Sequence, residues 1–266
     1  MPHIRCSALA GLVLAFGLQM TTVAPVRAQG PSAKEIAAAN NPLADIRALN
    51  LHNYYVPKLF DVENQTANTF WLRGVMPTGP VLWRASLPLQ TVPPSDGRTT
   101  SSSGVGDFNI FAAYLAVQKP GMSFGIGPLL VAPTATEDEL GAGKWQLGIA
   151  SVVFSVPSPA LQVGALVTWQ ASVGGDSERP DTSVLTTQIF SMWQLGGGTY
   201  LRSTPIWVFD LRTGNYNIPF GIGIGKVLKV DKTVFNIFFE PQFTILYQGV
   251  GQPAVQIFSG LNLQFN

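Results

Sequence analysis

The stretch Ala254-Val-Gln-Ile-Phe-Ser-Gly-Leu-Asn-Leu-Gln-Phe265 alternates between two kinds of residue. Its odd-numbered positions from Val255 to Phe265 are apolar apart from Ser259. The even-numbered positions carry amides, a glycine and one aromatic ring, at Gln256, Phe258, Gly260, Asn262 and Gln264. A repeat of two residues is that of a β-strand, whereas a helix would repeat every 3.6 residues. The stretch therefore predicts a strand whose two faces meet different surroundings.

The same alternation recurs along the rest of the chain. Apolar residues between Phe235 and Tyr247 alternate with polar ones, and residues 161–170 repeat the pattern. We expect twelve strands, at residues 47–56, 67–76, 81–91, 105–118, 122–132, 144–156, 161–172, 183–194, 200–210, 218–229, 233–247 and 254–265. Twelve is an even number, as closed bacterial barrels require.

The links between these strands are alternately long and short. The long links are rich in Gly, Pro, Ser, Thr and acidic residues and lie at 57–67, 92–104, 133–143, 173–182, 211–218 and 247–253. The short links are tight turns at 77–80, 119–121, 157–159, 196–198 and 230–232. Outer-membrane barrels have short periplasmic turns and longer outside loops. The alternation therefore favours a barrel whose two ends face different compartments.

The composition of the two strand faces separates a membrane barrel from a soluble one. A soluble β-sandwich or lipocalin-like barrel also alternates, but its outward face is polar and charged. Here the polar faces hold mostly Gly, Gln, Ser and Thr, and only 12% of the chain is charged. Aromatic residues lie near the ends of the apolar faces, where a membrane-interface girdle needs them: Tyr55, Trp83, Trp145, Trp169, Trp193, Trp207, Tyr247 and Phe265. We therefore expect an all-β transmembrane antiparallel barrel.

The N-terminus has the pattern of a secretory signal peptide. Arg5 precedes an uncharged run with an apolar centre, and Val26-Arg27-Ala28 places small residues at the two positions that matter for cleavage. A membrane-anchoring helix is the alternative, but the apolar core of residues 8–18 is short for a bilayer. We expect a signal peptide at 1–28, an N-terminal segment at 29–46 and the barrel at 47–266.

The expected mature chain is nearly neutral and has no cysteine. Removing Arg5 and Arg27 reduces the 16 basic residues to 14 against 15 acidic ones, a net charge of about −1. No basic stripe is present to neutralise phosphates, so we do not expect nucleic acid to be a partner. Cys6, the one cysteine, lies in the expected signal peptide, which excludes a disulfide framework.

A short helix is expected ahead of the first strand. Ser32 followed by Glu35 forms a capping-box pattern, residues 36–39 favour a helix, and Asn41-Pro42 ends it. This helix is about two turns long. It could enter the lumen as a plug or lie in the periplasm, and the sequence does not decide between the two.

Charged residues outside the strands divide between the two kinds of link. Four lysines cluster at short turns, at Lys119, Lys226, Lys229 and Lys232. Nine acidic residues lie in the long links: Asp61, Glu63, Asp96, Glu137, Asp138, Glu139, Asp176, Glu178 and Asp181. We expect an acidic outer surface and a lysine-bearing periplasmic end. Solvation explains the acidic loops most simply, and divalent-ion bridging to lipopolysaccharide is the alternative.

Ionisable and amide residues on inward faces are the main functional candidates, because charge away from bulk water is costly unless paired or hydrated. Arg73 and Arg84 lie on adjacent strands, while Arg202 and Asp210 share a face of the ninth. A structural salt-bridge ladder and a constriction that selects solutes both fit this pattern. The expected lumen and substrate-path residues are Arg73, Arg84, Arg202, Asp210, Asn236, Glu240 and Gln242.

Catalysis and cofactor binding find little support in the sequence. His52 is the one histidine of the expected mature chain, and no nucleophile elbow or metal-ligand cluster accompanies it. We expect His52 to line the lumen or to be structural, and we expect no cofactor or bound metal. The glycines at 221, 223 and 225 do not form a nucleotide fingerprint and are interpreted as small inward positions that leave space.

Several local patterns resemble one family of outer-membrane proteins of Gram-negative bacteria, named for the MetA pathway of phenol degradation. The matching stretches are Asn41-Pro42-Leu43-Ala44, Ala67-Asn68 with Arg73, Gly104-Val105-Gly106-Asp107, Pro133-Thr134-Ala135-Thr136, Leu140-Gly141 and Gly143-Lys144-Trp145-Gln146. The resemblance spans nearly the whole expected mature chain. It implies a barrel that moves small, often aromatic or otherwise hydrophobic, compounds across the outer membrane.

The sequence thus predicts a narrow channel or facilitator for small compounds in the cell outer membrane. Twelve strands fall between the roughly 8 that fill their own interior and the roughly 16 that leave an aqueous channel. A non-conducting structural or surface-binding barrel is the alternative, and an enzyme is not expected. Expected partners are outer-membrane lipid and lipopolysaccharide, a small-molecule solute, and the barrel-assembly machinery, which would engage the C-terminal strand.

Overall fold

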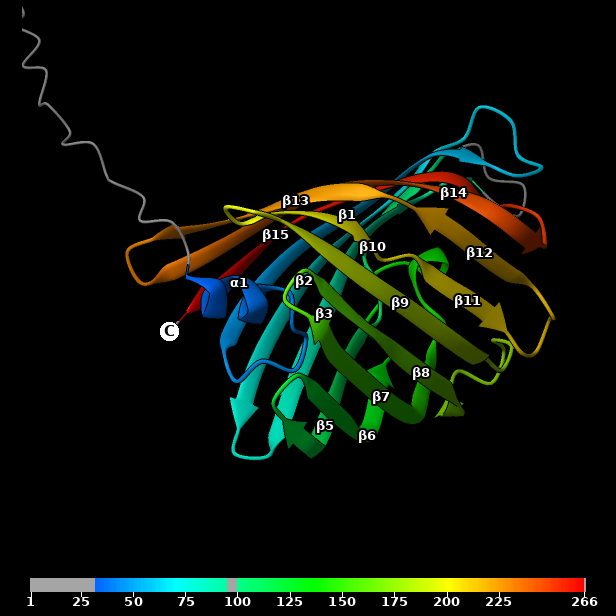
Figure 1. The fold of residues 1–266 in the computed structure, drawn as a ribbon. Coiled ribbons are helices and arrows are strands. Elements are labelled where there is room, and N and C mark those ends of the chain that lie inside the picture. The colour runs from blue at the N-terminus through cyan, green and yellow to red at the C-terminus, as the bar shows by residue number, and fades with distance from the viewer. Residues whose placement is uncertain (1–31, 95–99, 266) are drawn as a thin grey trace, which may run out of the picture.

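A computed structural model describes residues 32–94 and 100–265. In this part of the chain, the strand segments form one antiparallel sheet that closes on itself, because β1 (Arg47–Leu59) pairs with β15 (Pro253–Phe265) (Figure 1). The other segments are β2 (Ala67–Thr78), β3 (Val81–Val92), β4 (Ser102–Val105), β5 (Phe108–Lys119), β6 (Met122–Ala132), β7 (Lys144–Ser158), β8 (Leu161–Gly175), β9 (Ser183–Gly196), β10 (Thr199–Ser203), β11 (Ile206–Asp210), β12 (Tyr216–Gly221), β13 (Gly223–Val230) and β14 (Thr233–Gln248).

Three of the expected strands are interrupted, so the segments make twelve barrel strands. β4 with β5, β10 with β11, and β12 with β13 each act as one strand. The break after β10 has a clear cause, because Pro205 has no N–H and the N–H of Thr204 donates to Glu240 Oε1 at 2.8 Å instead of to a neighbouring strand. The predicted twelve-stranded antiparallel barrel is confirmed.

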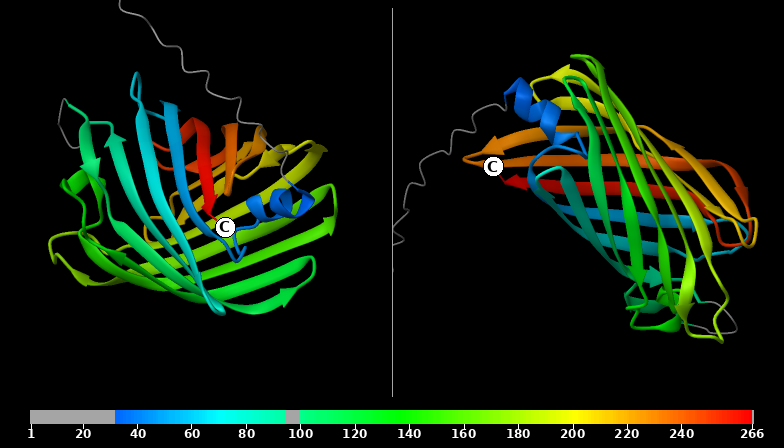
Figure 2. Two further views of the ribbon diagram at one scale, coloured as in Figure 1. Left: turned by 90° about the vertical axis from the view of Figure 1, so that its left-hand side faces the viewer. Right: turned by 90° about the horizontal axis from the view of Figure 1, so that it is seen from below.

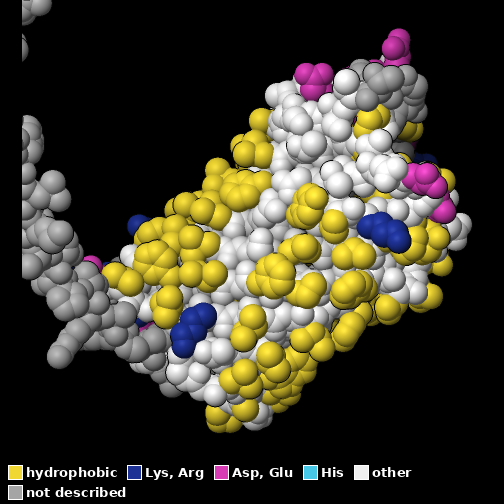
Figure 3. Space-filling model, turned by 90° about the horizontal axis from the view of Figure 1, so that it is seen from above, with side chains coloured by type: hydrophobic (Ala, Val, Ile, Leu, Met, Phe, Trp, Pro, Cys, Tyr) yellow, Lys and Arg dark blue, Asp and Glu magenta, His cyan; other side chains and the backbone are white. Residues whose placement is uncertain are grey.

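The outward face of the barrel is apolar. Large side chains that would be unfavourable in water are exposed on nearly every strand, among them Leu72, Ile149, Ile189, Phe239 and Ile245. Figure 3 shows such side chains spread over the barrel wall. Seven of the eight expected girdle aromatics are exposed, and the eighth, Trp207, is half-buried and donates its indole N–H to the carbonyl of Pro219 at 3.2 Å. A bilayer is the environment that such a wall requires.

The two ends of the barrel differ as the link lengths predict. The short turns gather at one end, where α1 (Ala33–Ala39) lies across the mouth within the ring of strands (Figure 2). The longer loops gather at the other end and include η1 (Asp138–Leu140), a short 3₁₀ helix. Asp96 and the expected signal peptide lie outside the described residues. None of the described helices is long and apolar enough to cross a bilayer.

Candidate functional site: a lumen closed at one end by a helix

The helix α1 is built by the capping pattern that the sequence predicts. The Ser32 hydroxyl accepts a hydrogen bond from the Glu35 N–H at 3.3 Å, and Glu35 Oε2 accepts from the Ser32 N–H at 2.8 Å. Asn40 ends the helix, and the Asn41 side chain then accepts from the Leu43 N–H at 2.9 Å. The chain turns there and enters β1, which places α1 inside the mouth of the barrel.

The barrel wall holds the C-terminal end of α1 through three amide side chains. The last carbonyls of a helix lack partners within the helix. Here Gln162 donates to the Ala37 carbonyl at 3.2 Å, Asn236 to the Ala39 carbonyl at 3.1 Å and Gln264 to the Ala39 carbonyl at 3.3 Å. These amides come from β8, β14 and β15. The structure therefore resolves the question that the sequence left open: the N-terminal helix is a plug at the short-turn end.

Packing and one ion pair add to this docking. Leu43 is buried in the same apolar cluster as Leu115, and Ile36 packs against that cluster. Glu35 Oε1 lies 2.6 Å from Lys229 Nζ, near the turn between β13 and β14. The ion pair joins the first turn of the helix to the rim of the barrel.

Acid is expected to loosen the docking of α1. The hydrogen bond from Lys229, together with those from Ser32, lowers the pKa of Glu35 from 4.5 to about 2. A lowered pKa in the docked state means that ionisation favours docking, fully above about pH 4.5 and progressively less down to about pH 2. A spin label at Ala38→Cys should therefore become more mobile as the pH falls from about 4.5 to about 2. The same pH change should alter the mobility of the label less in the Lys229→Met variant. If the mobility stays constant over this pH range while Glu35 and Lys229 are both present, the expectation is wrong.

The lumen has an apolar wall on one side. Inward side chains of β3 and β5 to β9 supply most of one buried cluster, with Leu82, Phe111, Val152, Leu166, Phe190 and Met192 among its members. The cluster extends to α1 and also takes in Tyr200, Val227 and Val234. The interiors of outer-membrane barrels are usually polar. An apolar wall of this extent is therefore a specific feature of this lumen.

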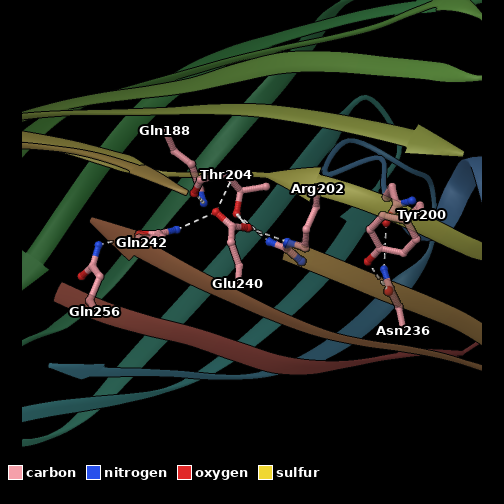
Figure 4. Close-up of polar contacts among 9 residues, drawn as sticks. Gln188, Tyr200, Arg202, Thr204, Asn236, Glu240, Gln242 and Gln256 are labelled. Carbon is pink, nitrogen blue, oxygen red and sulfur yellow. Dashed lines mark hydrogen bonds and ion pairs between the residues drawn. The ribbon is translucent and has the colours of Figure 1, made fainter. Parts of the chain in front are cut away.

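The opposite side of the lumen carries a buried polar network centred on Glu240 (Figure 4). Glu240 is fully buried and accepts from Arg202 Nε at 2.7 Å, from the Thr204 hydroxyl at 2.8 Å and from Gln242 at 2.7 Å. Gln256 in turn donates to Gln242 at 2.6 Å. The Arg202 guanidinium also lies 3.5 Å from the ring centre of Phe238. Charge-assisted hydrogen bonds and a cation–π contact together satisfy this buried ion pair.

A stripe of inward glycines makes room for this network. Gly223 on β13 pairs with Arg202 on β10, and a Cβ at Gly223 would collide with Glu240 on β14. Gly225 lies under the ring of Tyr200 in the same way, and the Tyr200 hydroxyl donates to Asn236 at 2.6 Å. Side chains from β10 and β14 therefore meet across the glycines of β13. The interpretation of these glycines as space-leaving positions agrees with the structure.

Arg73 and Arg84 lie on the lumen side of β2 and β3 and have aromatic neighbours. Arg73 lies 4.6 Å from the ring centre of Trp71, and Arg84 lies 4.5 Å from that of Phe111. Arg73 Nη1 also donates to His52 Nδ1 at 2.8 Å, so His52 Nε2 carries the proton that is donated to Asn262 at 2.7 Å. In residues 32–94 and 100–265, Arg202 is the one lumen arginine of the three with an acidic partner.

The structure thus brings four of the seven expected lumen residues together and places three elsewhere. Arg202, Glu240 and Gln242 belong to one network, and Asn236 adjoins it while holding α1. Asp210 is at the outer end of β11, where its carboxylate accepts from the N–H groups of Arg212 and Thr213 instead of facing Arg202. Arg73 and Arg84 lie outside the network, although His52, which Arg73 contacts, packs against Phe238 beside Arg202. Sequence reasoning missed Tyr200, Thr204 and Asn40, although the glycine stripe could have indicated a large neighbour such as Tyr200.

The outer loops are held by their own hydrogen bonds. The segment 104–107 contacts the segment 133–136: the Thr136 hydroxyl accepts from the Val105 N–H at 3.1 Å, and Asp107 accepts from the N–H groups of Thr134 and Ala135 at 3.1 and 3.2 Å. Two stretches that resemble the phenol-degradation family are therefore adjacent in space. They fix the loop that carries η1 against the outer ends of β3 and β4.

Several loop acids have internal partners. Asp181 lies 3.5 Å from Lys144 and 3.8 Å from Arg212, and Asp138 lies 3.9 Å from Arg179. Exposed pairs such as Asp138 with Arg179 contribute at most about 1 kcal/mol each, whereas the Lys144 side chain is only 8% exposed. No group of three or more His, Cys, Asp or Glu side chains among the described residues could hold a metal ion. Ion pairs within the protein thus explain two of the acidic residues in the long loops, Asp138 and Asp181.

Between α1 and the middle of the barrel lies a cavity of about 150 Å³. Its floor is the turn after α1, around Asn40. Phe111, Val152, Leu166 and Phe190 line its apolar side, whereas Asn50, His52, Asn236, Asn262 and Gln264 line its polar side together with Arg73, Arg84 and Arg202. The cavity therefore offers apolar surface together with amides and guanidinium groups, and Arg84 lies directly beside Phe111.

A closed twelve-stranded barrel with an apolar outer wall, unequal ends and a partly polar interior defines an outer-membrane β-barrel. Among solved structures, the chain is similar to an outer-membrane channel from Pseudomonas putida F1, with a TM-score of 0.61 and 13% identity over 84% of this chain and 97% of that one. It is also similar to the NanC porin, with a TM-score of 0.53 and 9% identity over 82% of this chain and 99% of that one. At these identities the likeness shows the fold.

No family model matches the chain. No curated protein matches its sequence either.

Proposed function

We propose that this protein is a narrow outer-membrane channel or facilitator for small compounds, including aromatic or otherwise hydrophobic ones. The observation that carries the proposal is the cavity in the lumen, which is lined by apolar side chains as well as by amides and guanidinium groups. A water-filled porin needs no apolar wall. A facilitator for hydrophobic solutes does need one, because apolar surface must leave water as the solute enters.

The remaining parts of the proposal follow from the same lumen. Arg73, Arg84, Arg202, Asn236, Glu240 and Gln242 form or adjoin the solute path, and Asp210 lies at its outer rim. We also infer that the chain is related to the phenol-degradation family, on the strength of the local sequence patterns that resemble it. No catalytic step is part of the proposed function.

The proposed partners are those of an outer-membrane barrel. Outer-membrane lipid would surround the apolar wall, and lipopolysaccharide would meet the loop end. The barrel-assembly machinery would engage β15, which must pair with β1 to close the barrel.

A non-conducting structural barrel is the second candidate, and the docked α1 favours it. The helix occupies the mouth of the barrel at the short-turn end, and three wall amides hold it there. If α1 never leaves the mouth of the barrel, solutes that enter the lumen from the loop end cannot pass out at the short-turn end.

Ion currents in planar lipid bilayers would separate the two candidates. The mature protein should give small currents that phenol, used as an aromatic probe, partly blocks. Gln188→Trp places a bulky ring beside the cavity and should reduce the current several-fold. Glu178→Gln in an outer loop is the matched control and should leave it unchanged. A silent bilayer, with no phenol uptake into proteoliposomes containing lipopolysaccharide, would exclude the channel.

A further inference from the structure

The polar side of the lumen cavity has donors without acceptors. Within the described residues, six buried side-chain polar atoms have no hydrogen-bond partner, and four of them belong to residues that line this cavity. Three of the four are N–H donors: Asn40 Nδ2, Arg73 Nε and Arg84 Nε. An unpaired buried donor is costly, and native proteins keep few of them. A cluster of such donors around one cavity indicates a site built for an acceptor.

The charge around the cavity is positive, and like the unpaired donors it favours a negatively charged acceptor. Arg202 is neutralised by Glu240 at 2.7 Å. Arg73 and Arg84 have aromatic rings, a neutral histidine and the buried Tyr54 hydroxyl as their neighbours, and within residues 32–94 and 100–265 they form no ion pair. Two uncompensated guanidinium groups in a partly apolar lumen favour an anion, because an arginine fork matches the two oxygens of a carboxylate.

The rest of the cavity limits the size and nature of this anion. Phe111 lies directly beside Arg84, and Leu166 and Phe190 present further apolar surface to the cavity. A cavity of about 150 Å³ with apolar lining admits a molecule the size of benzene. A larger anion would not fit into this volume. A fully polar anion would leave the apolar side chains without apolar contacts.

We propose that the cavity binds a small carboxylate with an apolar, ring-sized body. Its carboxylate accepts hydrogen bonds from Arg84 and Arg73, with Asn40 at the floor, and its ring lies against Phe111 and the apolar wall. This inference rests on the proposed function, and it names the class of solute that the lumen prefers. It also gives α1 a part in recognition, because Asn40 ends that helix.

Calorimetric titration of the full mature protein in detergent tests the proposal, with benzoate as the probe. Benzyl alcohol has the same ring without the charge, and acetate has the carboxylate without the ring. Benzoate should bind at least tenfold more tightly than either. Arg84→Gln should weaken benzoate binding roughly tenfold to a hundredfold, as expected for a lost charge-assisted contact, and should leave benzyl alcohol unaffected. Lys119→Gln removes one positive charge at an exposed turn and should change neither.

Two further measurements keep the test decisive. Arg84→Lys retains the charge without the fork, so it should bind benzoate with intermediate affinity even if Arg84→Gln fails to fold. Equal binding of benzoate and benzyl alcohol, or equal losses in Arg84→Lys and Lys119→Gln, would overturn the proposal. Ion current with no benzoate preference would remove this inference and leave the channel intact. Benzoate binding without current would remove the channel and leave the site.

Discussion

Replacing Glu240 by glutamine is expected to destabilise the barrel by about 3–5 kcal/mol, the usual cost of leaving one member of a buried ion pair uncompensated. Glutamine keeps the shape of the side chain and can still accept from the Thr204 N–H, but it leaves the Arg202 guanidinium without its counter-charge. Both side chains of the pair are at most 6% exposed, so water cannot replace the lost partner. Unfolding by urea in phospholipid vesicles, followed by tryptophan fluorescence, measures the change.

A second variant separates the charge effect from the loss of packing. Arg202→Met with Glu240→Gln removes both charges, and it should recover most of the stability that Glu240→Gln loses, because the pair costs desolvation energy as well as supplying attraction. Asp138→Asn breaks a pair whose acid is 89% exposed and should cost at most about 1 kcal/mol. If Glu240→Gln unfolds at the same urea concentration as the unaltered protein, water reaches the pair and the network does not hold the barrel together.

The barrel itself could be predicted from the sequence because its determinants are local. Alternation with a period of two is visible within each strand, and the lengths of the links indicate which ends face the same side. The capping box of Ser32 and Glu35 is also local, and the structure contains it. Interruptions such as the one at Thr204 and Pro205 could not be located, because the Thr204 N–H turns to a carboxylate 36 residues away.

The arrangement of the lumen depends on partners that are far apart in the chain. Arg202 meets Glu240 across a third strand, and this is possible because Gly223 lies between them. Sequence alternation placed Arg202 and Asp210 on one face, but it could not show that Asp210 would turn to the N–H groups of Arg212 and Thr213. The docking of α1 likewise requires amides from β8, β14 and β15, and no local pattern joins these three.

Deleting residues 33–39 is expected to raise the conductance of the channel on the order of tenfold. The barrel closes through the pairing of β1 with β15, which begins at Arg47, so the deletion leaves the wall complete. It removes the helix that lies across the short-turn end, and twelve strands without a plug enclose a lumen between filled and porin-sized barrels. Single-channel recordings in planar bilayers measure the change, and gel mobility before and after heating shows that the deleted protein still folds.

A point substitution tests the same closure without shortening the chain. Asn236→Leu removes the donor to the Ala39 carbonyl and the acceptor for the Tyr200 hydroxyl, so the helix should leave the mouth more often and the recordings should show brief openings to the conductance of the deletion variant. Thr168→Val alters a lumen hydrogen bond to Thr186 that has no contact with α1, and it should leave the recordings unchanged. If the deletion and Asn236→Leu conduct no better than the unaltered protein, the resistance lies elsewhere.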